Sequence, residues 1–248
     1  MTEIQEDLQR VEQWMENNRR IVNLTKTKCM LFGTKQKLAN FSFKIQLHGS
    51  AIDRVRNFFY LGVILDEYLS WKEHVSKVCT KVNKRLGLLG RIRSYLTLKA
   101  AKCVYNCLVL PVLCYTDTAW VELSVECKSR LQRLQNRTAR IIVRRDSTSE
   151  ALKTLGWPNI ETIRKRNKSI LVYKSGLNNL VPQYLCDYFS RNRSFHSYDT
   201  RRSEDIHPSR LKLSLGKRTF RYPGAILFNS LPETYKRAAS LGLLSDGY

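Results

Sequence analysis

The sequence has few acidic residues, no paired metal-binding cysteines and no long apolar stretch. Its 248 residues contain 21 Asp and Glu against 43 Lys and Arg, a formal net charge of +22. The seven cysteines are odd in number and form no Cys-x-x-Cys pair, which argues against a disulfide framework and favours a reduced, intracellular protein. The longest apolar run, Cys103 to Tyr115, is interrupted by Asn106 and falls short of the ~20 residues of a membrane-spanning helix.

Other common sites and signals are also missing. Thr2 to Glu16 is acidic and amphipathic, so we expect no signal peptide and a protein of the nucleus or cytoplasm that is not secreted and has no membrane partner. Cys103, Cys107 and Cys114 share one face of a predicted helix, but no histidine completes a ligand set there and we expect no bound metal. No Ser-His-Asp arrangement, glycine-rich phosphate loop or zinc signature is present.

What the sequence has in excess is positive charge. A pI near 9.9 points to a polyanionic partner, because each phosphate that a cation neutralises releases condensed counterions and so favours binding. Nucleic acid is the favoured partner, with an anionic membrane surface and a basic but inert surface as the alternatives. With 43% hydrophobic residues the chain can also bury a core in one or two domains.

Hydrophobic periodicity predicts a mainly α-helical chain with a small antiparallel β region near the N-terminus, an α+β fold with a helical bundle. Apolar residues at intervals of three and four predict the longer helices, which cover about 2–17, 71–96, 98–108 and 124–145. Strands are predicted at Lys26–Gly33, Phe41–Leu47 and Phe58–Leu65. The last is a continuous apolar run, typical of a strand buried on both faces, and its Gly62 suggests a bulge.

Two of the predicted helices carry rows of cations beside their apolar faces. Ser70 is the expected N-cap of the first, with Glu73 three residues on as in a capping box. The rows are Lys77, Lys81, Lys84 and Arg91 on the first helix, and Arg130, Arg133, Arg137, Arg140 and Arg144 on the second. Like charges four residues apart cost a few tenths of a kcal/mol each, so an unbroken row indicates an anionic partner. A merely solvated face is the alternative.

The predicted strands and helices divide the chain into three expected regions. Residues 1–70 contain the β region, residues 71–146 the helical bundle, and residues 147–248 a basic C-terminal region. From Arg191 to Arg221 few apolar residues remain to offset the entropy of ordering, so we expect a loosely ordered segment there.

Several segments resemble reverse transcriptases of LINE-type (non-LTR) retrotransposons, especially the jockey-like elements. They are Asn23–Thr27 with Met30–Phe32, then Tyr60–Val63 with Leu69–Trp71 and His74, and finally Tyr222–Pro232. The resemblance implies that residues 1–70 are the remnant of a polymerase palm and that residues 71–146 are its thumb. It also implies that Lys26 is the lysine of motif D, and that Tyr60, Leu61 and Gly62 belong to the primer grip.

The same resemblance implies that the catalytic carboxylates are missing. Polymerisation by two Mg²⁺ ions needs clustered aspartates, which this family carries as an Asp-Asp turn before motif D, and the sequence has no Asp-Asp pair. We therefore expect a truncated polymerase that is inactive by itself and binds template–primer nucleic acid through a basic thumb. Lys26 could act as a general acid only with a substrate held nearby.

The resemblance also sets the expected partners. They are RNA, RNA/DNA duplex and the missing palm and fingers of the parent polymerase, with Mg²⁺ needed only by the full-length enzyme and no cofactor in this fragment. Three alternatives stay open: a non-catalytic RNA-binding or partner-binding module, a fragment that completes an active enzyme in trans, and a pseudogene product without function.

Overall fold

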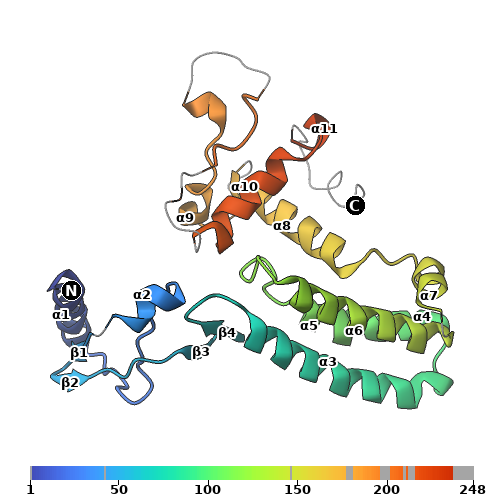
Figure 1. Cartoon of the computed structure of the whole chain (residues 1–248), viewed down its shortest axis with the longest axis horizontal. Helices are drawn as coiled ribbons and strands as arrows, with labels where there is room; N and C mark the ends of the chain where they lie inside the picture. The colour runs from blue at the N-terminus through green and yellow to red at the C-terminus, as the bar shows by residue number, and fades with distance from the viewer. Residues whose placement is uncertain are drawn as a thin grey trace. The chain divides into compact units, whose positions relative to one another are not determined.

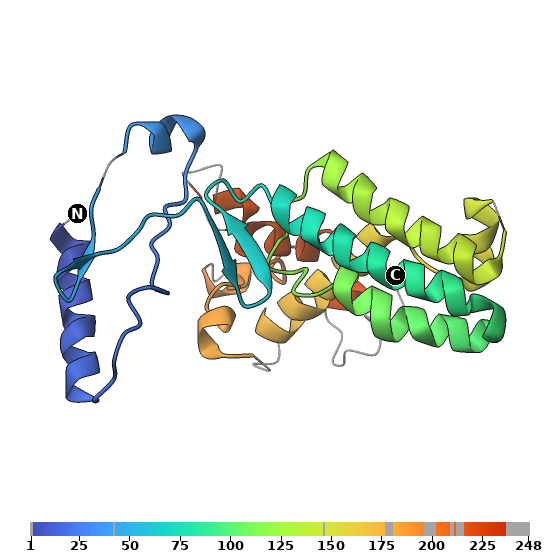
Figure 2. The same cartoon turned by 90° about the horizontal axis from the view of Figure 1, so that it is seen from below.

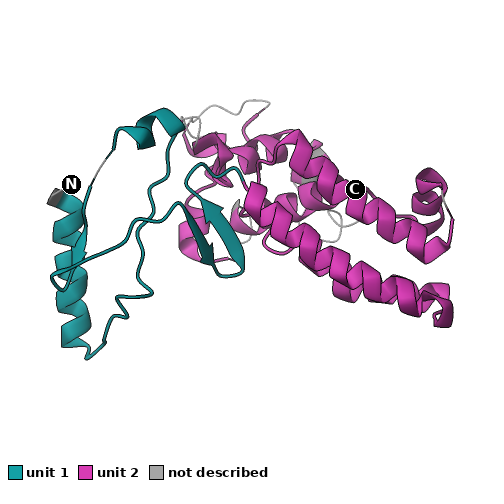
Figure 3. Cartoon of the chain, turned by 60° about the horizontal axis from the view of Figure 1, so that its bottom comes forward, with its two compact units in different colours: residues 1–70 teal, residues 71–248 magenta. Residues whose placement is uncertain are grey.

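The computed structural model describes residues 2–41, 43–145, 147–176, 181–195, 202–208, 211 and 216–236. The chain divides into two compact units, residues 1–70 (unit 1) and residues 71–248 (unit 2) (Figure 3). Unit 1 holds every strand in the described ranges, and unit 2 is helical (Figure 1). The predicted fold class, mainly helical with a small antiparallel β region near the N-terminus, is confirmed. The assignment of these regions to a palm and a thumb stays a prediction.

Unit 1 combines one long helix with two short hairpins. Its elements are α1 (Thr2–Asn17), α2 (Lys35–Ala39), β1 (Gln46–Leu47), β2 (Ser50–Ala51), β3 (Asn57–Tyr60) and β4 (Val63–Asp66). The side chain of Gln5 on α1 donates to the Gln46 carbonyl at 2.9 Å and accepts from the Gln46 N–H at 3.2 Å. Helix α1 is thereby tied to the first hairpin by hydrogen bonds.

The apolar run from Phe58 to Leu65 is a hairpin, and our prediction of one strand was wrong. Strands β3 and β4 pair antiparallel with Tyr60 opposite Val63, so Leu61 and Gly62 form a two-residue turn. Both have positive φ, +45° and +89°, as a type I′ turn requires, and Gly62 is therefore a turn residue and no bulge. The run is also half exposed, since Phe59 and Tyr60 each keep 56% of their surface.

The other two predicted strands of unit 1 are mostly absent from the described residues. In Lys26–Gly33 the backbone makes one isolated parallel bridge, where Cys29 bonds Asp53 and Val55 on either side of Arg54. Of the described residues in Phe41–Leu47, only Gln46 and Leu47 lie in a strand. The alternation of apolar and polar residues predicted strands here. That pattern does not tell whether a partner strand lies beside the segment.

Unit 2 begins with its longest helix, α3 (Lys72–Ile92). Its buried face includes Val75, Val82, Leu86 and Leu89, which confirms the predicted apolar stripe. The predicted Ser70 cap was wrong. Trp71 occupies the N-cap position with φ +62° and makes no side-chain cap, while Ser70 donates through its backbone N–H and hydroxyl to the carboxylate of Asp66.

The second helical segment of unit 2 changes from an α-helix to a π-helical turn before Pro111. It runs as η1 (Arg93–Tyr95), α4 (Leu98–Val104), the π-helical turn η2 (Tyr105–Val109) and α5 (Leu110–Leu113). Pro111 lies in the first turn of α5 and has no N–H to donate. The N–H of Leu110 donates to the Tyr105 carbonyl, five residues earlier. The guanidinium of Arg85 donates to the Leu108 carbonyl. A π-turn thus precedes Pro111 in this helical segment.

The third long helix, α6 (Val125–Val143), is the one that the sequence defined best. Ser124 caps it by accepting from the Cys127 N–H, and Arg144 ends it with φ +58°. Helix α7 (Thr148–Leu155) follows and packs on α6, capped by Ser147 and ended by Gly156 at φ +66°. The predicted division at residue 146 therefore falls inside unit 2.

The remaining helices build a second apolar core around α8 (Ile160–Gly176). They are α9 (Gln183–Cys186), η3 (Asn192–Ser194), η4 (Gly216–Arg218), α10 (Arg221–Asn229) and α11 (Glu233–Lys236). The buried cluster consists of Val172, Phe189, Ile206, Ala225 and Phe228. Gly224 lets α10 approach α8, because a Cβ there would stand 3.0 Å from the Val172 side chain.

Part of the segment expected to be loosely ordered takes part in this core. Arg191 and Ile206 form an antiparallel bridge, Arg191 pairs with Glu204, and the buried ammonium of Lys236 lies 2.6 Å from Asp205. Composition alone missed this, because a few apolar residues are enough when they reach a core built elsewhere. Residues 196–201, 209–210 and 212–215 lie outside the described residues, and for them the expectation stays a prediction.

Candidate nucleic-acid interface

The predicted lysine row lies on the outward face of α3. Lys77, Lys81, Lys84 and Arg91 are all exposed, on the side of the helix opposite the buried stripe of Val75, Val82 and Leu89. Burial, Arg164 and Lys77, in that order of effect, lower the pKa of the nearby His74 to about 4.

The predicted arginine row lies along α6 beside α3. Arg133, Arg137 and Arg140 are exposed and Arg130 is half-buried. The guanidinium of Arg130 donates to the Ser76 hydroxyl at 3.4 Å, and that of Arg137 donates to the Asn83 amide oxygen at 3.0 Å. Because both contacts advance by seven residues on each helix, α3 and α6 run parallel, side by side (Figures 1 and 2).

A strip of small or short polar residues separates the two rows of cations. It follows α3 at intervals of four and three, through Ser76, Thr80, Asn83, Gly87 and Gly90, and all five are exposed. A Cβ at Gly87 or Gly90 would meet no atom within 4 Å, so the fold itself does not require glycine there. We call this strip and the two rows the basic face, made of Lys77, Lys81, Lys84, Arg91, Arg130, Arg133, Arg137 and Arg140 with the five strip residues.

The arginines of the basic face have no acidic partner in the described part of the chain. No ion pair joins Arg130, Arg133, Arg137 or Arg140 to a carboxylate there. Neighbouring cations behave differently, since Lys128 pairs with Glu161 at 3.2 Å and Arg145 with Glu150 at 3.5 Å. The sequence explains the contrast, because α6 has no Asp or Glu after Glu126. Four arginines in a row therefore present uncompensated charge.

Arg144 is the one predicted member that leaves the row. It is the C-cap of α6 in the left-handed conformation, with its N–H bonded to the Arg140 carbonyl, so its side chain departs from the helical stripe. The predicted helix, 124–145, extends two residues past the observed end at Val143, because the cation spacing of three and four continues past the last turn.

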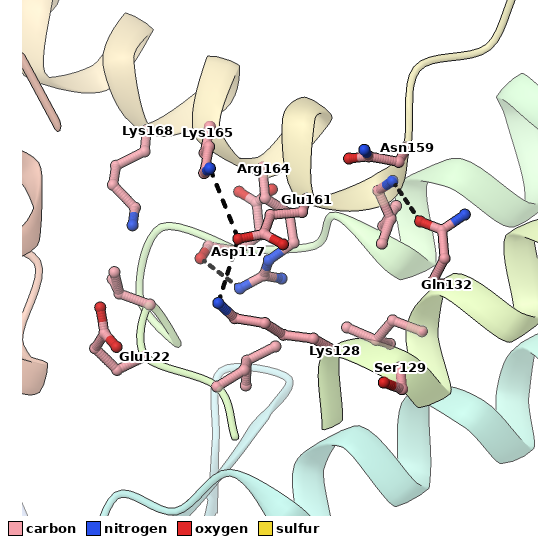
Figure 4. A pocket seen from close by; sticks show the side chains of 14 residues that line it. Asp117, Glu122, Lys128, Ser129, Gln132, Asn159, Glu161, Arg164, Lys165 and Lys168 are labelled. Carbon is pink, nitrogen blue, oxygen red and sulfur yellow. Dashed lines mark hydrogen bonds and ion pairs between the residues drawn. The ribbon is translucent and has the colours of Figure 1, made fainter. Parts of the chain in front are cut away.

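A second charged site, which the sequence analysis missed, lies between α6, α8 and the loop before α6. Figure 4 shows its cations and carboxylates converging on a pocket of about 360 Å³. Glu161 accepts from Lys128 at 3.2 Å and lies 3.7 Å from Lys165. Burial raises the pKa of Asp117, which accepts from Asn167 at 2.9 Å, and burial lowers the pKa of Lys168 to about 8.

In unit 1 the predicted motif D lysine lies in a hydrogen-bonded turn. The side-chain oxygen of Asn23 accepts from the Lys26 N–H at 3.1 Å and from the Thr25 hydroxyl at 2.7 Å. Lys26 itself is exposed. The primer-grip-like residues Tyr60, Leu61 and Gly62 form the tip of the β3–β4 hairpin, where Leu61 keeps 74% of its surface.

The described ranges contain neither a cluster of metal-ligating side chains nor a membrane-spanning helix. No three His, Cys, Asp or Glu side chains come together there in a way that could hold a metal ion. The Sγ atoms of Cys103 and Cys107 lie 3.9 Å apart, and burial with the nearby Asp117 raises the pKa of Cys114 to about 12. Among the described helices, none combines the length and the apolar character needed to cross a membrane.

Comparison with known proteins gives one informative similarity. The chain is 31% identical over 143 residues to the "Probable RNA-directed DNA polymerase from transposon BS" of Drosophila melanogaster. The match covers 56% of this chain and 16% of that protein, so the chain spans less than a fifth of its relative. No family model and no solved structure matches. The similarity supports an origin in a reverse transcriptase-like protein of a transposon.

Proposed function

We propose that the chain is the C-terminal part of a LINE-type, jockey-like retrotransposon reverse transcriptase and that its basic face grips a template–primer duplex. The similarity to a transposon RNA-directed DNA polymerase supports the origin. The single observation that carries the binding role is the arginine row of α6, exposed and without an acidic partner in the described residues. Such a row loses free energy to self-repulsion unless an anion lies on it.

The geometry of the basic face fits a sugar-phosphate backbone. From Arg130 to Arg140 the row extends about 15 Å along α6, at 1.5 Å per residue, and each strand of a B-form duplex places one phosphate about every 3.4 Å along the duplex axis. Lys77, Lys81 and Lys84 run parallel to it across the strip of short side chains. Contacts of this kind fix the position of a duplex without reading its sequence.

The exposed glycines of the strip support the same role. Gly87 and Gly90 lie inside α3, where each costs about 0.5–1 kcal/mol relative to alanine. Neither contacts another element that a methyl group would displace. A nucleic-acid backbone that lies close to α3 would explain why these two positions have glycine, which has no side chain.

In this proposal the chain binds the duplex and does not extend the primer. The sequence contains no Asp-Asp pair, and Lys26 lies in a solvent-exposed turn. Primer extension by the purified chain with Mg²⁺ and deoxynucleotides is therefore expected to be zero. Measurable extension would overturn this part of the proposal.

The binding role is tested by a triple variant that removes three positive charges, Arg133→Gln, Arg137→Gln and Arg140→Gln. Fluorescence anisotropy with a labelled RNA/DNA duplex should show affinity about 10- to 100-fold lower than wild type, because three phosphate contacts are lost. The matched control removes three exposed cations elsewhere in unit 2, as Lys99→Gln, Lys153→Gln and Arg202→Gln. Equal losses in the two triple variants would mean that net charge, and not the basic face, determines binding.

A further inference from the structure

The pocket in Figure 4 is distinct from the basic face and holds polar groups that have no partner in the described part of the chain. It is formed by the loop residues Asp117 and Glu122, by Lys128 and Gln132 of α6, and by the first turns of α8. Its volume of about 360 Å³ is at the small end of the range for ligand sites. All these residues belong to unit 2.

Four cations and three carboxylates line the pocket, and they do not pair off completely. Glu161 is shared between Lys128 and Lys165, at 3.2 and 3.7 Å. The Asp117 carboxylate accepts from the side-chain amide of Asn167. In the described residues Lys168 forms neither a hydrogen bond nor an ion pair, although it is half-buried and extends toward the pocket (Figure 4).

Arg164 is held in place with one of its donors unused. Its guanidinium lies 3.9 Å above the ring of Trp120, and its Nη2 donates to the carbonyls of Trp120 at 2.7 Å and Asp117 at 3.3 Å. Its Nη1 is buried and has no acceptor among the residues that the structure describes. A buried donor without an acceptor costs about 1–3 kcal/mol, so Nη1 of Arg164 favours an acceptor, and the half-buried Lys168 adds a second cation beside it.

We propose that this pocket binds the phosphate group of a nucleotide. A phosphate offers several strong acceptor oxygens and up to two negative charges, which matches the unused Nη1 of Arg164 and the unpaired ammonium of Lys168. Lys128 and Lys165, which now share one carboxylate, would gain a second anion. The phosphate can come from a free nucleotide or from the end of a nucleic-acid strand, because the chemistry is the same.

The charge of Lys168 makes the binding depend on pH. Burial lowers its pKa the most, Glu122 and Asp117 raise it, Arg164 and Lys128 lower it, and the net result is a pKa of about 8. A bound phosphate favours the protonated amine, so the protein takes up a proton on binding near pH 8. Affinity is therefore expected to be highest below pH 8 and to fall as the pH rises above it.

Isothermal titration of the full chain with adenosine monophosphate, adenosine and inorganic phosphate tests the proposal. We expect the monophosphate to bind and adenosine not to bind. Lys168→Gln should weaken binding at least tenfold, a loss that Lys168→Arg should largely avoid, and the matched control Lys174→Gln, on the same helix outside the pocket, should leave it unchanged. No binding at about 1 mM, or equal affinity with Lys168→Gln, would overturn the proposal.

Two further titrations identify the source of the phosphate and separate this site from the basic face. A short oligonucleotide with a 5′-phosphate that binds more tightly than the monophosphate would indicate a strand end, and the reverse order would indicate a free nucleotide. The triple variant of Arg133, Arg137 and Arg140 should bind the monophosphate as wild type does. If it loses the monophosphate together with the duplex, the pocket is not a separate site and the proposal fails.

Discussion

The two units of the chain differ in charge and in how they are held together. Unit 1 contains ten Lys and Arg against eight Asp and Glu, whereas unit 2 contains 33 against 13. Among the described residues, Leu47 and Val63 are the buried apolar side chains of unit 1, and the other buried apolar side chains all belong to unit 2. Almost the whole excess of positive charge is therefore carried by the unit with the extensive core.

This difference shows which unit can present charge in a fixed geometry. In unit 2 the arginine row lies on a helix whose opposite side is fully buried, with Leu131 and Ile142 at 0% exposure. Unit 1 depends more on individual hydrogen bonds, such as the Glu12 carboxylate accepting from the His48 N–H at 2.5 Å. Its helix α1 leaves Trp14 60% exposed.

The largest expected effect contrasts equivalent core truncations in the two units. Leu131→Ala in unit 2 should lower the free energy of unfolding by about 2–5 kcal/mol, because it leaves a cavity in a packed core. Leu47→Ala in unit 1 should cost less than half as much, because the thin core around it can collapse or admit water. Urea unfolding followed by circular dichroism measures both, and a larger loss for Leu47→Ala would reverse the comparison.

A smaller loss is expected from acid, through a buried histidine of unit 2. Burial, Arg164 and Lys77 lower the pKa of His74 from 6.5 to about 4. Between pH 6.5 and 4 the unfolded chain therefore binds more protons than the folded one, so stability falls as the pH drops through this range. The variant His74→Gln should show a flatter dependence of melting temperature on pH. An identical slope in both proteins would contradict this placement of His74.

The smallest effects concern the glycines of the basic face, where stability and binding should move in opposite directions. Gly87→Ala and Gly90→Ala should each raise the free energy of unfolding by about 0.5–1 kcal/mol, because alanine is the better helix former and meets no clash. Both should weaken duplex binding severalfold by holding the backbone away from α3. Stabilisation without any loss of binding would show that nothing approaches α3 at these positions.

The sequence predicted those elements whose signals are local. Helix α6 has a serine cap, an apolar stripe at intervals of three and four, and a row of arginines beside it, all visible within one short segment. The β3–β4 hairpin was missed because Leu61-Gly62 is not one of the usual turn pairs and the apolar run continues through it. The register of the hairpin depends on how β3 and β4 pair, and the residue pattern of one strand does not show this.

The candidate sites show the same contrast between local signals, which the sequence contains, and contacts between distant residues, which it does not reveal. The basic face could be predicted row by row, but its parallel arrangement depends on the contacts of Ser76 with Arg130 and of Asn83 with Arg137. The pocket could not be predicted, because Asp117 and Lys168 are distant in the sequence and each looks like an ordinary charged residue. Only the Glu161–Lys165 pair, four residues apart on one helix, has a local signal.

The central claim, that the arginine row neutralises phosphates, is tested most directly by the salt dependence of duplex binding. The logarithm of the association constant is plotted against the logarithm of the salt concentration for wild type and for the variant Arg133→Gln, Arg137→Gln, Arg140→Gln. Three lost phosphate contacts predict a slope shallower by about 2–3. Parallel lines for the two proteins would contradict the account.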